Sequence, residues 1–139
     1  MTPADSPDPT AAPPVDAALL DEAVELCRQA GELTLKWFRS IELSVDHKGD
    51  GTPVTAADKA AERFLREELE GRFPDDAIHG EEEDDKPGVS GRRWIIDPID
   101  GTKAFTKGVP LYCNLLALED EHGVAIGVIN LPGLTEVVY

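Results

Sequence analysis

The stretch Trp94-Ile95-Ile96-Asp97-Pro98-Ile99-Asp100-Gly101-Thr102 is the part of the chain from which its fold and chemistry are most readily predicted. An apolar strand runs into two carboxylates, Asp97 and Asp100, with a proline turn between them. A glycine and a threonine follow at the start of a predicted helix. Carboxylates at a strand end bind hard cations, and backbone amides at a helix start bind anions. The stretch therefore predicts a Mg²⁺-assisted phosphate site.

Two long helices are predicted before this stretch. Apolar residues recur at helical spacing from Val15 to Phe38, and Gly31 marks a close helix contact. A second helix begins after Thr55, whose capping box Asp58 completes, and it ends near Gly71. Both helices thus precede all of the predicted strands.

The rest of the chain predicts a sheet. Strands are expected over residues 77–79, 93–97, 111–119, 124–130 and 136–139, with a short helix over 102–107. This order predicts an α+β fold, a layered sandwich in which long N-terminal helices pack on a largely antiparallel sheet. Residues 1–14, rich in Pro, Ala and Asp, are expected to form a disordered tail before a domain over 15–139. Because the chain ends inside an apolar strand, we expect the domain to be truncated.

The composition excludes several classes of partner. The chain has 13 Lys and Arg against 28 Asp and Glu, a net charge of −15. This charge argues against binding to nucleic acid or an anionic membrane, and no apolar run approaches the ~20 residues of a membrane span. No secretory signal is visible, so a cytoplasmic protein is expected. A small phosphorylated metabolite would also be repelled unless bound cations reverse the local charge.

Cysteine usage adds little to this prediction. Cys27 and Cys113 both stand in apolar contexts, which favours two buried thiols and leaves a disulfide open. Their spacing is not that of a metal-binding pair.

Residue types at the strand end suggest separate roles. The Asp97 and Asp100 carboxylates and the Ile99 carbonyl are oxygen ligands of the kind that Mg²⁺ accepts. Gly101 lets the backbone approach a ligand, and the amides of Gly101 and Thr102 can hold phosphate oxygens. The Thr102 hydroxyl can orient a water. The alternative is a simple Asp-Pro turn in which Asp100 caps the helix.

Three further residues have a structural and a functional interpretation. Glu81 directly follows a strand and Gly80, within reach of a metal shared with Asp97, although it also begins a solvated acidic loop. Asp58 is either a metal or water partner or a carboxylate stabilised by the helix dipole. Lys48 is either a site-lining cation or a surface lysine.

Three blocks, taken in this order, resemble the inositol monophosphatase family of Mg²⁺-dependent, lithium-sensitive phosphatases. They are Pro53-Val54-Thr55-Ala56-Ala57-Asp58, Gly80-Glu81-Glu82 and the stretch from Trp94 to Thr102. The third block is highly specific, and the resemblance covers about residues 16 to 139. It implies the N-terminal part of the family's fold and hydrolysis of a phosphomonoester by a metal-activated water.

The resemblance also assigns roles within the site. It implies ligands for two or three Mg²⁺ ions, namely Glu81, Asp97, the Ile99 carbonyl and Asp100. Thr102 with Asp58 would orient the attacking water, and the Gly101 and Thr102 amides would hold the phosphate. A later aspartate of the family, and its C-terminal domain, lie beyond Tyr139, so residues 1–139 alone are expected to have little activity. Family members are often dimers, which makes a homodimer a further expectation.

The flanking residues favour one branch of the family. Lys103-Ala104-Phe105, Gly108-Val109-Pro110 and Leu115-Leu116-Ala117-Leu118 look like the histidinol-phosphatase branch, whose members serve histidine biosynthesis. The alternatives are an inositol-1-monophosphatase and another phosphatase of the superfamily, acting on a nucleotide 3′-phosphate or a sugar bisphosphate. A non-enzymatic acidic module that binds cations or a basic partner is the alternative outside enzymes.

Overall fold

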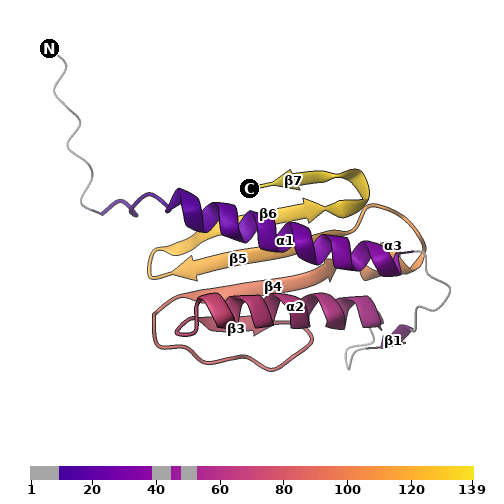
Figure 1. The fold of residues 1–139 in the computed structure, drawn as a ribbon, viewed down its shortest axis with the longest axis horizontal. Coiled ribbons are helices and arrows are strands. Elements are labelled where there is room, and N and C mark those ends of the chain that lie inside the picture. The colour runs from indigo at the N-terminus through magenta and orange to yellow at the C-terminus, as the bar shows by residue number, and fades with distance from the viewer. Residues whose placement is uncertain (1–9, 39–44, 48–52) are drawn as a thin grey trace, which may run out of the picture.

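The computed structural model describes residues 10–38, 45–47 and 53–139. Two long helices, α1 (Ala17–Trp37) and α2 (Ala56–Arg72), lie side by side across one face of a five-stranded sheet (Figure 1). The predicted tail falls largely outside the described part, which includes only its residues 10–14. The predicted layered α+β fold is confirmed. No helix among the described residues has the length and apolar character needed to cross a bilayer.

The sheet has the order β3-β4-β5-β6-β7. Its strands are β3 (Ala77–Gly80), β4 (Arg93–Asp100), β5 (Cys113–Asp120), β6 (Gly123–Leu131) and β7 (Glu136–Val138). The pairs from β4 to β7 are antiparallel, whereas β3 and β4 are parallel. The connection over residues 81–92 has the length of about a dozen residues that a parallel pair needs. The sheet is therefore largely antiparallel, as predicted, with one parallel pair at its edge.

Smaller elements complete the fold. A two-stranded antiparallel ladder joins β1 (Val45–His47) to β2 (Pro53–Thr55), immediately before α2. The short helix α3 (Thr102–Thr106) follows β4, and a 3-10 turn (Pro132–Leu134) connects β6 to β7. Both ends of α3 lie within one residue of the prediction.

Side chains along each strand point alternately to the two faces of the sheet, and those on one face pack under the helices. Trp94 and Ile96 of β4 are buried there, as are Leu116 and Leu118 of β5. The Trp94 indole N–H donates to Asp76 Oδ2 at 2.9 Å, so the largest core side chain has its polar atom satisfied. The core between the helices and the sheet therefore fixes β4 in place up to the predicted site.

The structure corrects one strand boundary. β4 continues to Asp100, whereas the sequence predicted that the strand would end at Asp97. The pairing with β5 shifts register between Asp97 and Asp100. Pro98 has no N–H to give to the ladder, and a bulge accommodates such a residue without ending the strand. Asp97 and Asp100 thus belong to one irregular strand.

The close contact predicted at Gly31 is with the sheet. A side chain added at Gly31 would lie 2.2 Å from Asn130 Nδ2 and 2.7 Å from Asn114 Oδ1. Both asparagines are buried on strands β6 and β5. Glycine is therefore required where α1 crosses these two polar side chains.

Candidate metal and phosphate site

The parallel pair β3–β4 brings two predicted ligands to one edge of the sheet. Gly80, the last residue of β3, pairs with Ile96 of β4. Because both strands run in the same direction, Glu81 leaves β3 beside the part of β4 that Asp97 occupies. Asp97 alternates with the buried Ile96, so its side chain belongs to the face of the sheet away from the helices.

Cys113 reports on the position of the two aspartates. It pairs with Asp100 across β4 and β5, and its thiol donates to Asp100 Oδ2 over 3.7 Å. Burial, followed by the negative charge and hydrogen bond of Asp100 and the negative charge of Asp97, raises the pKa of Cys113 to about 11. Asp100 therefore lies beside this thiol, and Asp97 precedes it on the same strand.

The two thiols differ in their surroundings. Cys27 is fully buried in α1, where its thiol donates to the Asn114 carbonyl oxygen at 3.4 Å. Burial raises its pKa to about 12. Cys27 and Cys113 are both free, so the disulfide that the sequence left open is not formed.

The turn from β4 into α3 has a conformation that needs glycine. Gly101 has a φ of +85°, in the left-handed region, and its carbonyl accepts the amide of Phe105 at 3.0 Å. The Thr102 hydroxyl donates to the Ile99 carbonyl oxygen at 3.2 Å. Gly101 occupies the N-cap position and no side chain caps the helix, so the alternative in which Asp100 caps α3 is wrong.

Asp58 lies at the start of α2, near the same turn. Its Oδ2 accepts the Thr55 amide at 2.9 Å and the Thr55 hydroxyl at 2.7 Å, which confirms the predicted capping box. The neighbouring Ala57 packs in a buried cluster with Ile99, Phe105 and Tyr112. The first turn of α2 is therefore anchored against the residues that flank the Asp100-Gly101-Thr102 turn.

The sequence did not reveal a buried ion pair on α2. Glu62 and Arg66 are 0% and 3% exposed, and Arg66 Nε donates to Glu62 Oε2 at 3.0 Å. Glu62 also accepts the amides of Glu82 at 2.9 Å and Glu83 at 2.8 Å, from the loop that contains Glu81. The available signal was a Glu and an Arg four residues apart, on the helix face that also carries the apolar Leu65.

Two buried asparagines were missed as well. Asn130 Nδ2 donates to Asn114 Oδ1 at 3.0 Å, and Asn114 Nδ2 donates to the Pro98 carbonyl at 2.7 Å. These bonds tie β6 and β5 to the bulge between Asp97 and Asp100. Polar residues at inward-facing positions of two strands were the signal that would have identified them.

The predicted metal ligands are neighbours without forming a ready-made cage. Within residues 10–38, 45–47 and 53–139, no group of three or more His, Cys, Asp or Glu side chains is arranged to hold a metal ion. The donors predicted along this edge are carboxylates and a backbone carbonyl, which are the ligands that a hard divalent cation prefers. Lys48, the other predicted site cation, lies outside the described residues.

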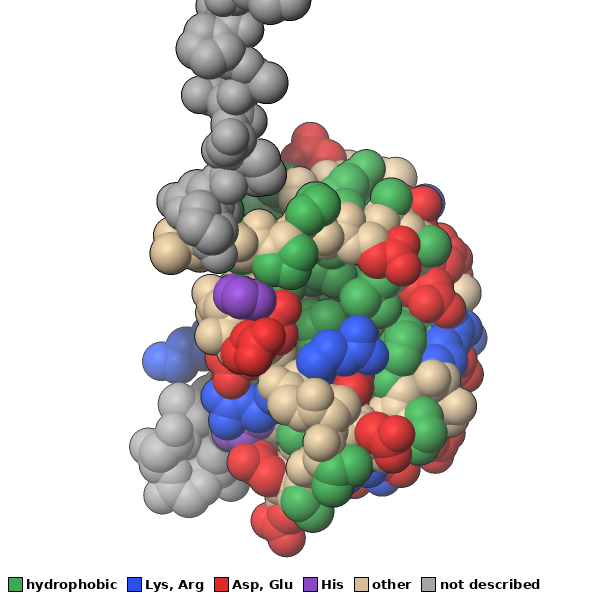
Figure 2. Space-filling model, turned by 90° about the vertical axis from the view of Figure 1, so that its left-hand side faces the viewer, with side chains coloured by type: hydrophobic (Ala, Val, Ile, Leu, Met, Phe, Trp, Pro, Cys, Tyr) green, Lys and Arg blue, Asp and Glu red, His purple; other side chains and the backbone are tan. Residues whose placement is uncertain are grey.

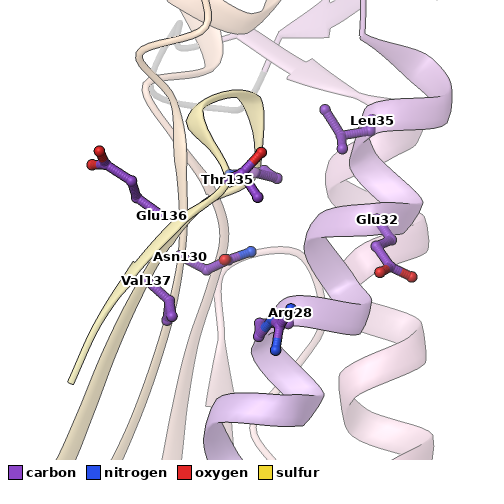
Figure 3. Close-up of a pocket in the computed structure, with 8 residues that line it drawn as sticks. Arg28, Glu32, Leu35, Asn130, Thr135, Glu136 and Val137 are labelled. Atoms are coloured by element: carbon purple, nitrogen blue, oxygen red, sulfur yellow. The ribbon is translucent and has the colours of Figure 1, made fainter.

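Two pockets lie away from this edge. One, of about 200 Å³, opens between α1 and the β6–β7 end of the sheet, with Arg28, Glu32 and Leu35 on the helix side and Asn130 and Val137 opposite (Figure 3). No predicted site residue lines it.

The second pocket, of about 280 Å³, lies at the β5–β6 turn, at the other end of the strands from α3. On this side of the molecule, hydrophobic side chains are recessed among acidic and basic ones (Figure 2). None of the predicted site residues lines this pocket either.

Comparison with known proteins identifies the family of the chain. The model of the inositol monophosphatase family matches residues 16–139. A histidinol-phosphatase of Chlorobaculum parvum is 52% identical over 118 residues, which are 85% of this chain and 46% of that protein. Inositol monophosphatase 3 of Solanum lycopersicum is 37% identical over 122 residues, covering 85% of this chain and 45% of that protein.

A solved structure shares the fold. The extragenic suppressor protein suhB from Bartonella henselae superposes with a TM-score of 0.82 at 31% identity, over 87% of this chain and 48% of that one. The chain thus spans about half the length of the relatives that it matches.

Proposed function

Because this chain belongs to the inositol monophosphatase family, we propose that it forms the cation- and phosphate-binding part of a Mg²⁺-dependent phosphomonoester hydrolase. The observation that supports this most is the parallel register of Gly80 with Ile96. Glu81 and Asp97 are the next residues along the two strands, so they leave this pair at the same edge of the sheet. Asp100 comes one bulge later, directly before the Gly101 turn. The proposal thus rests on membership of a phosphatase family and on a sheet edge rich in oxygen donors, which such an enzyme needs for its cations.

Each residue of the edge has a proposed task. Glu81, Asp97, the Ile99 carbonyl and Asp100 would hold two or three divalent ions, for which their oxygen donors are suited. When bound, such ions supply Lewis acidity that stabilises negative charge on the phosphoryl group. Since the described side chains form no ready-made cage, ion binding would have to draw these carboxylates together.

The residues of the following turn would handle the substrate. The amides of Gly101 and Thr102 would donate hydrogen bonds to phosphate oxygens. The Thr102 hydroxyl oxygen keeps its acceptor lone pairs while donating to the Ile99 carbonyl, so it can orient a water for attack on phosphorus. Asp58, held nearby by the capping box, would accept a proton from that water.

For the substrate, we propose histidinol phosphate. The 52% identity to a histidinol-phosphatase exceeds the 37% identity to an inositol monophosphatase over similar lengths. The alternatives are inositol 1-phosphate, a nucleotide 3′-phosphate and a sugar bisphosphate. We further propose a cytoplasmic enzyme of histidine biosynthesis, active as a homodimer and with no nucleic-acid or membrane partner.

A substrate panel tests this proposal. The protein made from the complete reading frame should hydrolyse histidinol phosphate with a kcat/KM about tenfold or more above that for inositol 1-phosphate. Hydrolysis should require Mg²⁺ and stop when EDTA is added. The 139-residue chain, assayed in parallel, should show little turnover.

The two parts of the proposal fail separately. Faster hydrolysis of inositol 1-phosphate would contradict the choice of histidinol phosphate as the substrate but would still support phosphatase activity. Absence of Mg²⁺-dependent hydrolysis across the panel would overturn the phosphatase and favour the acidic binding module.

A further inference from the structure

The loop that carries Glu81 is held by one buried carboxylate. Glu62 Oε1 accepts the Glu82 amide at 2.9 Å, and Glu62 Oε2 accepts the Glu83 amide at 2.8 Å. A carboxylate that accepts two successive amides fixes the direction of that backbone, because neither peptide plane can rotate without losing a charge-assisted bond.

The same carboxylate fixes the residue before Glu81. A side chain added at Gly80 would lie 2.5 Å from Glu62 Oε1 and 2.6 Å from its carboxyl carbon. Gly80 therefore packs directly against the Glu62 carboxylate, and only a residue without a side chain can approach it so closely. The backbone is thus held at Gly80 on one side of Glu81 and at Glu82 and Glu83 on the other.

Arg66 completes the arrangement. Its Nε donates to Glu62 Oε2 at 3.0 Å, and its Nη2 donates to the Glu83 carbonyl oxygen at 3.0 Å. The guanidinium therefore holds both the carboxylate and the loop that the carboxylate binds.

Burial of this pair has no obvious benefit for stability alone. Glu62 and Arg66 are 0% and 3% exposed, and a buried ion pair often contributes no more to stability than well-packed apolar residues would. Its bonds go to a surface loop, whose Glu81 side chain is exposed. Glu62 also lies one helical turn after Asp58, so one helix presents both residues to the predicted site.

We propose that Glu62 and Arg66 are positioning residues, which hold the loop so that the Glu81 carboxylate faces the cation shared with Asp97. This inference deepens the proposed function and rests on it, because it requires Glu81 to be a cation ligand. Glu62 itself does not touch the ion. It determines where the ligand stands, as the partners of metal ligands do in other sites.

Glu62→Gln is the test, with Mn²⁺ as the probe, in the protein made from the complete reading frame. The amide keeps the shape of the side chain but removes its charge, which weakens every bond that it accepts, and its NH₂ group faces either the Glu82 amide or the pair of donors at Oε2, the Glu83 amide and Arg66 Nε. In the metal-free protein, hydrogen exchange at the Glu82 and Glu83 amides should accelerate about tenfold or more. The Mn²⁺ dissociation constant, measured by titration, should rise about tenfold or more.

The kinetic signature should distinguish positioning from general damage. The Mg²⁺ concentration required for half-maximal activity should increase, whereas the KM for substrate at saturating Mg²⁺ should stay within about twofold of the unmodified protein. Loss of folding would instead lower the apparent kcat and leave both half-saturation concentrations unchanged.

The matched control is Glu83→Gln. It makes the same carboxylate-to-amide change in the same loop and weakens the exposed pair between Arg63 Nη1 and Glu83 Oε1, 2.6 Å apart. It leaves the hydrogen bond from the Glu83 backbone amide to the Glu62 carboxylate in place. Mn²⁺ affinity should therefore change less than about twofold, as for most exposed ion pairs.

A second variant decides the matter if Glu62→Gln does not fold. Arg66→Lys keeps a positive charge beside Glu62 but loses the donation from Nη2 to the Glu83 carbonyl, and it should also weaken Mn²⁺ binding. Unchanged Mn²⁺ affinity in folded Glu62→Gln, or in Arg66→Lys in its place, would overturn the inference. An equal loss in Glu83→Gln would overturn it too, because loop charge would then explain the effect. If the unmodified protein binds no Mn²⁺, the proposed function itself fails and this inference falls with it.

Discussion

Replacement of Asp97 by Asn is expected to lower kcat/KM for phosphomonoester hydrolysis by about 10³-fold or more, in the protein made from the complete reading frame. The proposed ions share the Asp97 carboxylate, so its loss removes stabilisation of the phosphoryl charge worth about 4 kcal/mol. Asp100→Asn should have an effect of the same order. Steady-state kinetics at saturating Mg²⁺, with circular dichroism to verify folding, measure both.

Asp84→Asn is the control for this prediction. Asp84 is an exposed residue of the acidic loop, and the substitution removes the same charge. Activity should stay within about twofold, because an exposed charge distant from the ion is screened by solvent. Equal activity in Asp97→Asn and the unmodified protein would refute the catalytic role, and retained binding of a basic partner would then favour the acidic module.

Gly31→Ala is expected to destabilise the chain by about 2–4 kcal/mol. The new methyl group would lie 2.2 Å from Asn130 Nδ2, which cannot move without loosening its bonds to the Cys27 carbonyl and to Asn114. Overpacking and the loss of a buried hydrogen bond each cost about 1–3 kcal/mol. Urea unfolding of the 139-residue chain measures the change in the free energy of unfolding.

The same substitution at Gly71 should have the opposite sign. Gly71 lies in α2, and a side chain added there would meet nothing within 4 Å. Gly71→Ala should therefore stabilise the chain by up to about 1 kcal/mol, the difference in helix propensity. If both variants changed stability alike, the account of the contact between Gly31 and the sheet would be wrong.

The effect of Gly31→Ala should extend to the predicted site. Asn114, which contacts Asn130, donates to the Pro98 carbonyl inside the bulge that separates Asp97 from Asp100. A shift of the asparagine pair would therefore reach the backbone between the two aspartates. α1, distant in sequence from this bulge, thus supports it through two side-chain amides.

Features of local origin were predictable from the sequence. The capping box of Thr55 and Asp58 spans three residues, so its geometry follows from the residue types. The two helices and most strands follow from periodicity, since each buries one face. Gly101 was predicted to let the backbone approach a ligand, whereas its φ of +85°, which glycine adopts without strain, was not predicted.

Features that depend on distant partners were not predictable. β4 continues past Pro98 because β5 pairs with it, which no local signal indicates. The parallel pairing of β3 with β4, which brings Glu81 beside Asp97, is likewise tertiary. Glu62 and Asn114 were missed because the loop amides and the strand carbonyl that they bind lie 16 to 21 residues away, and because their burial is visible only in the folded chain.

Addition of Mn²⁺ to the isotope-labelled 139-residue chain, followed by amide NMR, tests the central claim most directly. If one cation site joins the ends of β3 and β4, the amides near Glu81 and those from Asp97 to Thr102 should broaden together at the lowest Mn²⁺ concentrations. Mg²⁺ added in excess should reverse the broadening. Broadening confined to Glu83, Asp84 and Asp85, with the amides at Asp97 and Asp100 unaffected, would contradict the account.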